Sequence, residues 1–191
     1  MNQKEHKQHL LDQLYEPYKK CLMCPLGTLG RKSVVFGSGN PDAKFMIIGE
    51  APGKDEDEQG IPFVGRSGRF LTKILTNLGI KREDIFITNS VKCRPPNNRK
   101  PTLLESKTCK DLLLDHQIKI IQPGAICTLG SAATESLLKK PVKMNEIHGK
   151  FLYCNSIVVF PTYHPAYIMR NPKKIDSFIE DLKKFFSFSD F

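Results

Sequence analysis

Short apolar runs alternate along this sequence with segments of helical periodicity, and this alternation constrains the fold more than any other feature. The apolar runs have the length and composition of strands and lie at 44–49, 85–88, 125–129 and 157–160. Each one ends at or just before a glycine, asparagine or proline, as buried strands usually do. Parallel strands need a crossover of about a dozen residues, usually a helix. The pattern therefore predicts the α/β class, with a central, mainly parallel four-stranded sheet covered by helices on both faces.

The helical segments carry their own boundary signals. Apolar residues recur at helical spacing at 10–18, 67–78, 102–121 and 175–186. Thr102 and Glu105 form a capping-box pair that opens the third of these helices, and Ser131 is expected to cap a short helix ending near residue 138. A further strand is predicted at 151–153. No linker or low-complexity tract divides the chain, so residues 1–191 are expected to form one domain.

The chain is basic, and its sequence predicts no membrane span. A formal net charge of +9 favours a polyanionic partner over a cationic one, although many basic proteins bind no nucleic acid. Its longest apolar runs, such as 45–48 and 157–160, fall far short of the roughly twenty residues that a membrane span needs. The N-terminal residues lead into no apolar signal core. We therefore expect a cytoplasmic protein with no membrane partner.

Four of the six cysteines have a spacing that is typical of metal sites. Cys21 and Cys24 form a C-x-x-C pair, followed by the isolated Cys93 and Cys109. In a cytoplasmic protein such thiols suit a tetrahedral metal ion or a four-iron cluster better than disulfides. The two isolated cysteines favour iron and sulfur, but the spacing by itself leaves zinc, or four unrelated thiols, open. The other two cysteines lie in or beside predicted strands and are assigned to the core.

Polar side chains follow the predicted strands at the points where the strands end. Glu50, Asn89 and His164 all occupy such positions. Because ligands bind beyond the carboxyl ends of the strands in parallel sheets, one rim would gather a carboxylate, an amide and an imidazole. Each residue also has an ordinary structural explanation. Asn89 could cap a turn, His164 could be a hydrogen-bonded structural histidine, and Glu50 could belong to a solvated acidic loop that continues to Gly60.

Two further features lie just before the helix at 67–78. Phe63, between Pro62 and Gly65, does not belong to the apolar face of a predicted amphipathic helix. It is therefore either a core residue or a ring that stacks on a base. Arg66 and Ser67 then open the helix. Free N–H groups at a helix start, with an arginine beside them, would form a binding site for a phosphate group.

Taken together, these residues resemble family 4, the iron–sulfur branch of the uracil-DNA glycosylase superfamily. The resemblance runs from about Cys21 to Arg170, most of the chain. Its motifs are Gly49-Glu50-Ala51-Pro52-Gly53, Pro62-Phe63-Val64-Gly65-Arg66, Thr88-Asn89, Val91-Lys92-Cys93-Arg94-Pro95-Pro96, Asn98-Arg99 and His164-Pro165. So many motifs in one order argue against coincidence.

The resemblance implies a three-layer α/β/α sandwich and an enzyme of base excision repair. Such an enzyme hydrolyses the bond between uracil and deoxyribose in DNA, releases free uracil and leaves an abasic site. By this resemblance Glu50 would activate or position water and His164 would support uracil O2. Phe63 would stack on the base, Asn89 would pair with its edge, and Ala51 would lie in the same substrate site. The implied ligands of a structural 4Fe-4S cluster are Cys21, Cys24, Cys93 and Cys109.

DNA contacts are expected at two places. Arg66 and Ser67 would bind a phosphate at the helix start. The segment 164–170 would fill the gap left by the flipped nucleotide, with Tyr167 and Ile168 as an apolar plug and Arg170 as a phosphate anchor. The alternative for this segment is a short helical cap whose apolar residues belong to the core. The expected substrate is uracil-containing DNA, single- or double-stranded, and the expected state is a monomer.

The sequence departs from the family pattern at two points. Ala166 follows His-Pro where serine is usual, and His148 precedes Gly149 where arginine is common. The second departure concerns a DNA contact rather than the chemistry. The alternative function is a metal-stabilised nucleic-acid-binding module without catalysis, which would not need a carboxylate, an amide and an imidazole together at the strand ends.

Overall fold

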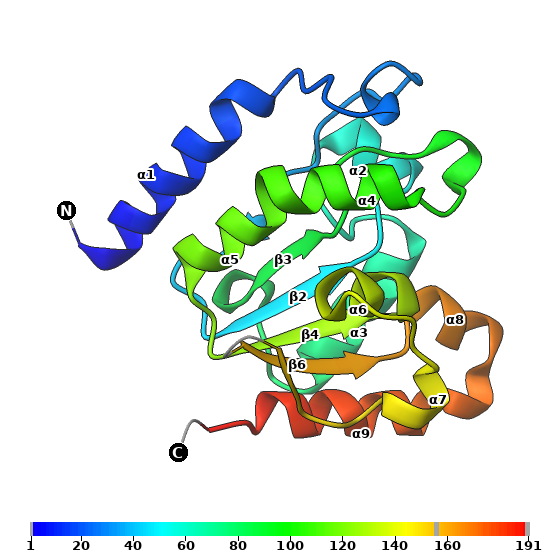
Figure 1. Ribbon diagram of the computed structural model, residues 1–191. Coiled ribbons are helices and arrows are strands. Elements are labelled where there is room, and N and C mark those ends of the chain that lie inside the picture. The colour runs from blue at the N-terminus through cyan, green and yellow to red at the C-terminus, as the bar shows by residue number, and fades with distance from the viewer. Residues whose placement is uncertain (1, 155–156, 190–191) are drawn as a thin grey trace.

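The centre of the molecule is a six-stranded sheet in the computed structural model, which describes residues 2–154 and 157–189 (Figure 1). The strand order is β1-β3-β2-β4-β6-β5. The inner strands β3, β2, β4 and β6 are parallel, and β1 and β5 pair antiparallel at the two edges. The strand bounds are β1 Ser38–Gly39, β2 Phe45–Gly49, β3 Phe86–Asn89, β4 Ala125–Leu129, β5 Leu152–Cys154 and β6 Ile157–Thr162.

The predicted α/β class with a mainly parallel sheet is confirmed, but the predicted number of four strands is wrong. The four apolar runs correspond to the four parallel strands, and β5 corresponds to the strand predicted at 151–153. The remaining strand, β1, has only two residues, a serine and a glycine. Such a short polar strand shows no alternating pattern, so the sequence gives no sign of it.

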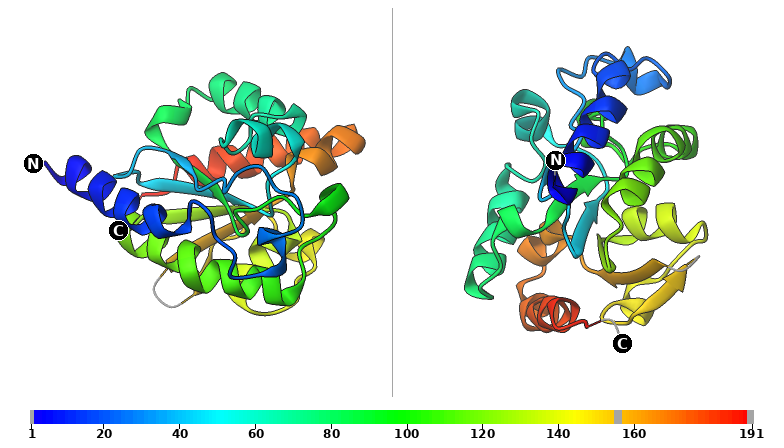
Figure 2. Two further views of the ribbon diagram at one scale, coloured as in Figure 1. Left: turned by 90° about the horizontal axis from the view of Figure 1, so that it is seen from above. Right: turned by 90° about the vertical axis from the view of Figure 1, so that its left-hand side faces the viewer.

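The helices form the two outer layers of an α/β/α arrangement (Figure 2). Their bounds are α1 Gln3–Tyr15, α2 Lys54–Gln59, α3 Arg66–Asn77, α4 Leu103–Cys109, α5 Asp115–Ile121, α6 Ser131–Leu138, α7 Met144–Ile147, α8 Pro165–Arg170 and α9 Ile175–Phe186. Short 3₁₀ helices lie at Glu16–Tyr18, Pro25–Gly27, Arg82–Asp84, Pro96–Asn98 and Pro172–Lys174. None of the helices in the described ranges is both long enough and apolar enough to cross a membrane.

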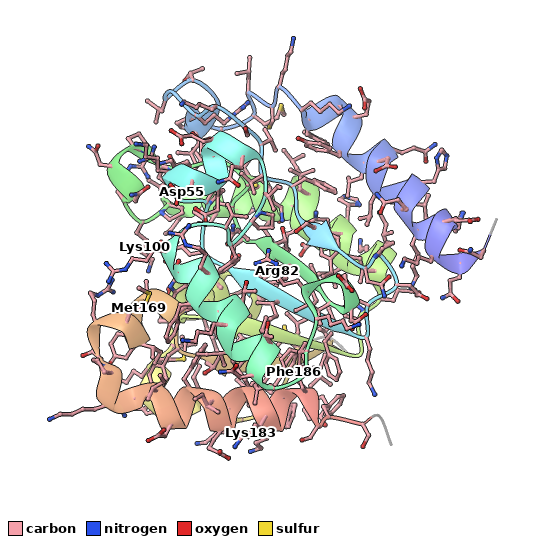
Figure 3. The ribbon with its side chains drawn as sticks, turned by 180° about the vertical axis from the view of Figure 1, so that it is seen from behind. Asp55, Arg82, Lys100, Met169, Lys183 and Phe186 are labelled. Atoms are coloured by element: carbon pink, nitrogen blue, oxygen red, sulfur yellow. The ribbon has the colours of Figure 1, made fainter. Side chains whose placement is uncertain are left out.

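Two separate cores lie on the two faces of the sheet, because successive strand residues point to opposite sides. Ile47 of β2 packs in one core with apolar side chains of α3, α8 and α9. Its neighbours Met46 and Ile48 pack in the other core with side chains of α1, α5 and α6. Figure 3 shows the face covered by α3, α8 and α9, with Met169 on α8 and Phe186 on α9. Both faces are buried, which is why the strands read as continuous apolar runs.

The predicted helix boundaries are confirmed only in part. The Thr102 hydroxyl accepts the N–H of Glu105, and the Glu105 carboxylate accepts the N–H of Thr102, so the capping box is confirmed. The helix predicted at 102–121 is present, but a π-helical turn at Lys110–Leu114 separates α4 from α5. Ser131 is not the cap of α6. Gly130, at φ 88°, takes that position because the chain turns there through a conformation that favours glycine.

Candidate active site

The carboxyl ends of β2 and β3 form the floor of the site. Gly49 of β2 pairs with Asn89 of β3 in parallel register. Beyond the strands, the N–H groups of Ser90 and Val91 donate to the carbonyls of Gly49 and Glu50, at 2.8 and 3.0 Å. The backbone that carries Glu50 and Asn89 is therefore held by the sheet itself rather than by a free loop.

Gly49 allows two side chains to lie directly over β2. A Cβ atom at this position would come within 2.4 Å of Asn89 Oδ1 and 2.5 Å of Phe63 Cζ. Real Cβ atoms do not approach other atoms so closely, so only glycine permits this arrangement. The close approach brings together an amide and an aromatic ring from two distant parts of the chain.

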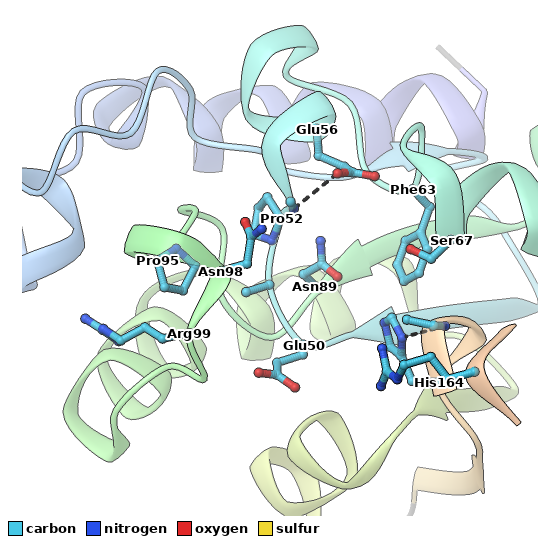
Figure 4. Close-up of a pocket in the computed structure, with 14 residues that line it drawn as sticks. Glu50, Pro52, Glu56, Phe63, Ser67, Asn89, Pro95, Asn98, Arg99 and His164 are labelled. Atoms are coloured by element: carbon cyan, nitrogen blue, oxygen red, sulfur yellow. Dashed lines mark hydrogen bonds between the residues drawn. The ribbon is translucent and has the colours of Figure 1, made fainter. Parts of the chain in front are cut away.

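A cavity of about 510 Å³ opens above this floor (Figure 4). Its lining includes most of the predicted catalytic, substrate-binding and DNA-binding residues, namely Glu50, Ala51, Phe63, Ser67, Asn89, His164 and Arg170. The structure thus places residues from β2, β3, α3, the end of β6 and α8 around one space of ordinary ligand-site size.

Glu50 is a partly buried carboxylate without a fixed partner. Among residues 2–154 and 157–189, no hydrogen bond to its side chain is found. Burial raises the pKa of the Glu50 carboxyl above its usual 4.5, while the charge of Lys100 acts in the lowering direction. A carboxylate with a raised pKa and free lone pairs is a better proton acceptor than an ordinary surface glutamate.

His164 is held in one tautomer by the start of α8. The N–H of Ala166 donates to His164 Nδ1 at 3.1 Å, so the proton of the neutral ring lies on Nε2. Burial lowers the pKa of His164 to about 4, and the charge of Arg170 adds to this effect. The imidazole is therefore neutral near pH 7 and offers an Nε2–H donor.

Phe63 lies in an unusual backbone conformation that its surroundings stabilise. Its φ is 53°, which is uncommon for a residue other than glycine. The guanidinium of Arg82 donates to the Phe63 carbonyl at 2.8 Å, and Gly68 of α3 lies so close that a Cβ there would come within 2.0 Å of the Phe63 carbonyl carbon. The ring is 5% exposed and lies 6.1 Å from the His164 ring, centroid to centroid. Phe63 is thus both a core residue and a wall of the cavity.

Asn89 is 2% exposed, at the end of β3. Its main-chain carbonyl accepts a hydrogen bond from Lys92 Nζ at 2.7 Å. In the described part of the chain its side-chain amide has no hydrogen-bond partner. An amide that lines a cavity with both a donor and an acceptor free is suited to recognise a ligand that offers the complementary pair.

The acidic segment after Glu50 is a short helix, α2, and two of its carboxylates are anchors for neighbouring loops. Glu56 accepts the N–H groups of Gly53, Val64 and Gly65, at 2.7 to 3.1 Å. Glu56 and Asp57 are 7% and 2% exposed. Asp57 accepts the N–H groups of residues 32 and 33. The ordinary explanation of this segment as a solvated loop is therefore wrong, because its partners lie on other parts of the chain that periodicity cannot reveal.

The residues expected to contact DNA are divided between surface and core. Arg66 and Ser67 begin α3 and, with Arg170, line a second cavity of about 390 Å³ beside the first. The Tyr167 ring stacks on Tyr163 at 5.2 Å. Ile168 is 1% exposed and packs in the core on the α3, α8 and α9 face. The expectation that Ile168 is a DNA-contacting plug is corrected: α8 turns this side chain toward the sheet, as in the helical-cap alternative.

The four cysteines with metal-site spacing lie around one apolar cluster, and all are free thiols. Cys93 and Cys109 are buried, and burial raises the pKa of these thiols to about 12 and about 11. The N–H of Lys92 donates to Cys109 Sγ at 3.2 Å. Within the described ranges, no three His, Cys, Asp or Glu side chains are grouped closely enough to hold a single metal ion.

Several cavity residues have no role in the sequence-based assignment. Asn98 and Arg99 line the main cavity. Arg99 donates two hydrogen bonds of 2.8 Å to the buried carboxylate of Glu105, and Asn98 adopts φ 54°. From the sequence, Asn98 and Arg99 are known only as part of the family motifs, without a place in the site. A further cavity of about 550 Å³ shares Glu50 and His164 with the main cavity and is lined in part by Lys143.

Comparison with known proteins agrees with this geometry. The family model described as "Uracil DNA glycosylase superfamily" matches residues 36–186. A type-4 uracil-DNA glycosylase of Saccharolobus solfataricus is 46% identical over 91% of this chain and 84% of its own length. One of Thermotoga maritima is 44% identical over 86% of both chains.

A more distant match is a type-5 uracil-DNA glycosylase of Pyrobaculum aerophilum. It is 30% identical over 67% of this chain and 63% of its own length. The type-4 proteins thus match more of the chain at higher identity, and the family model covers β2 through α9, the elements that carry Glu50, Asn89 and His164. On the strength of both comparisons, this chain belongs to the type-4 branch of the uracil-DNA glycosylase superfamily.

Proposed function

We propose that this protein is a DNA-repair glycosylase that hydrolyses the N-glycosidic bond between uracil and deoxyribose, producing free uracil and an abasic site. The observation that carries the proposal is the convergence of a carboxylate, a free amide and a neutral imidazole donor on one cavity. A nucleic-acid-binding module without catalysis would have no use for the unpartnered, partly buried carboxylate of Glu50, whose desolvation disfavours its charged form.

The two reactive groups match the two charges that develop as the bond breaks. Uracil leaves as an anion while the sugar gains oxocarbenium character, so the site must stabilise negative charge on the base and supply water to the sugar. His164 would donate Nε2–H to uracil O2. Glu50 would hold the attacking water and accept its proton. In this proposal the histidine remains neutral throughout, in agreement with its lowered pKa.

Base recognition would fall to Asn89 and Phe63. The Asn89 amide offers an acceptor to uracil N3–H and a donor to O4, whereas cytosine presents the opposite pattern at these two positions. Phe63 would stack on the flipped base, beside Ala51. Asn89→Asp keeps the size of the side chain but removes the donor toward O4, so we expect uracil excision to fall by about 10²-fold.

The target base must leave the stack before it reaches this cavity, because the bond to be cut is inaccessible in a duplex. Arg66, Ser67 and Arg170 line the adjoining cavity and would bind backbone phosphates around the flipped nucleotide. The partly buried Tyr167 would lie at the edge of this surface. Both single- and double-stranded DNA are proposed substrates. We further propose that residues 1–191 act as one domain and as a monomer in the cytoplasm.

The four clustered cysteines would hold a 4Fe-4S cluster. Two observations support this fit over separate thiols. A backbone N–H already points at Cys109 Sγ, and the buried Nε of Arg31, whose charge acts on Cys93, has no partner in the described part of the chain. When bound, such a cluster would cross-link distant segments and would have a structural role.

The test uses anaerobically purified protein and a uracil-containing oligonucleotide. We expect abasic sites to appear with wild-type protein and His164→Ala to slow single-turnover excision by about 10²-fold or more, with little change in DNA affinity. Binding without any excision would refute the proposal and favour the binding module. Iron analysis should give four irons per chain. Stoichiometric zinc without iron would refute the cluster but not the activity.

A further inference from the structure

Lys92 is a fully buried lysine between the cysteine cluster and the cavity floor. It is 0% exposed. Its Nζ donates to Thr88 Oγ1 at 2.6 Å, to the Asn89 carbonyl at 2.7 Å and to Gln117 Oε1 at 2.6 Å. An ammonium group has three donors, and here each one has an acceptor at short distance.

The same residue also contacts the cysteine region through its backbone. The Lys92 N–H donates to Cys109 Sγ at 3.2 Å, and Cys93 follows Lys92 in the chain. One residue therefore touches a proposed cluster ligand with its main chain and the proposed uracil-reading residue with its side chain. Asn89 in turn lines the cavity, which Lys92 does not.

We propose that Lys92 is a positioning residue for base recognition, which acts by fixing the peptide group of Asn89 so that its amide faces uracil. This proposal rests on the proposed function. The Asn89 amide has no hydrogen-bond partner in the described part of the chain, so its direction depends on the backbone that carries it and on contact with Gly49. The bond from Lys92 Nζ holds the carbonyl of that backbone.

A role limited to stability would not require a charged residue here. Burying an ammonium group costs free energy, and well-packed apolar replacements of buried charges are often neutral or stabilising. The side chains of Thr88 and Gln117 are each held by a second hydrogen bond, because Thr88 Oγ1 and Gln117 Nε2 both donate to the Phe36 carbonyl. Removal of the Lys92 side chain should therefore affect the position of the Asn89 carbonyl more than the positions of the other two acceptors.

A double-mutant cycle separates positioning from general support. Single-turnover uracil excision is measured for wild-type protein, Lys92→Met, Asn89→Ala and the double variant. If Lys92 acts through Asn89, Lys92→Met slows excision about tenfold or more in the wild-type background but less than about threefold when Asn89 is already alanine. Equal losses in both backgrounds would overturn the proposal.

Tm and iron content are measured for every variant, so that a loss of folding or of the cluster is recognised as such. Thr88→Val is the matched control, because it removes one Lys92 bond and leaves the bond to Asn89. Its rate loss should be the same with or without Asn89. Should Lys92→Met not fold, the cycle is run with Lys92→Leu, which also removes the bond to the Asn89 carbonyl. There too, additive losses would overturn the proposal.

The experiment also distinguishes this inference from the proposed function. Wild-type protein that excises no uracil would refute the proposed function itself. Active wild-type protein with additive losses would refute only the positioning role of Lys92.

Discussion

Glu50 and the acidic helix α2 are neighbours in the sequence but differ in almost every physical respect. The Glu56 and Asp57 carboxylates accept backbone N–H groups from two other stretches of chain, 32–33 and 64–65, and from Gly53 at the start of α2. Glu50 has no such donor in the described residues, and its pKa is raised by burial. A carboxylate saturated with donors anchors the structure, whereas one buried without donors is free to react. Acidic composition alone does not distinguish the two.

The largest effect that tests this contrast is expected for Glu50→Gln. The variant keeps the shape of the side chain but cannot accept a proton from water, so single-turnover excision should slow by about 10²–10⁴-fold. Its Tm should stay the same or rise slightly, because an unpartnered buried charge is removed. A substantial fall in Tm together with the rate would show that Glu50 is an anchor like its neighbours in α2.

The opposite result is expected for Asp57→Ala. Two backbone N–H groups lose their charged acceptor in a partly buried place, which should cost about 2–4 kcal/mol of unfolding free energy. Excision per folded molecule should change by less than about threefold, since Asp57 is outside the cavity lining. Thermal unfolding checks the predicted loss of stability, and a single-turnover assay checks the predicted excision rate.

Glu58→Ala is the matched control for Asp57→Ala. Its carboxylate belongs to the same helix but is 40% exposed and pairs with Lys32 at 3.3 Å. Exposed pairs of this kind contribute little, so the loss should be below about 0.5 kcal/mol. A loss as large as that of Asp57→Ala would mean that acidity in α2, rather than the buried hydrogen bonds, stabilises the molecule.

Strands and rim residues could be predicted from the sequence because both follow from local rules. A buried parallel strand is an apolar run with a turn former at its end, and the residue after it must lie at the rim. The partners of Glu56 and Asp57 could not be predicted, since those hydrogen bonds join segments with no shared periodicity. Ile168 was misassigned for a related reason: α8 is too short to show which side faces the core.

Titration of Glu50 should change uracil excision and stability in opposite directions as the pH rises. Because the folded-state pKa of Glu50 is raised above 4.5, excision should fall as the pH drops through that raised value. The folded-state pKa of His164, about 4, lies below its usual 6.5, so the His164 contribution to stability rises with pH between these two values. Between 4.5 and its raised pKa the native Glu50 carboxyl binds more protons than in the unfolded chain, so the Glu50 contribution, measured as the difference in unfolding free energy between wild type and Glu50→Gln, should decline as the pH rises through this window.

Residual activity of Glu50→Gln provides the control for the pH profile. The fall in excision rate at low pH is the acid limb of the rate profile. If Glu50 causes it, the acid limb should disappear in Glu50→Gln and persist in Asp57→Ala. Survival of the same limb in Glu50→Gln would assign it to another group.

The smallest expected effect concerns the charges around Glu50. Lys100 lowers the Glu50 pKa and Glu135 raises it, and the two residues pair at 3.4 Å on the surface. Lys100→Met should therefore move the acid limb of the rate profile to slightly higher pH, and Glu135→Gln should move it to slightly lower pH. Shifts of the same sign would show that the pair acts by packing rather than by charge.

The π-helical turn between α4 and α5 sets the directions in which the side chains of α5 point relative to those of α4. Residues of a regular helix advance about 100° each, so Cys109 and Gln117 would lie about 80° apart around its axis. The π-helical turn holds one extra residue. Cys109 and Gln117 therefore lie around the helix axis as if they were seven residues apart, which is about two full turns. Both side chains can then meet Lys92. Deletion of a single residue from Lys110–Leu114 would rotate one half of the helix against the other, so that either the sulfur or the amide would lose that partner.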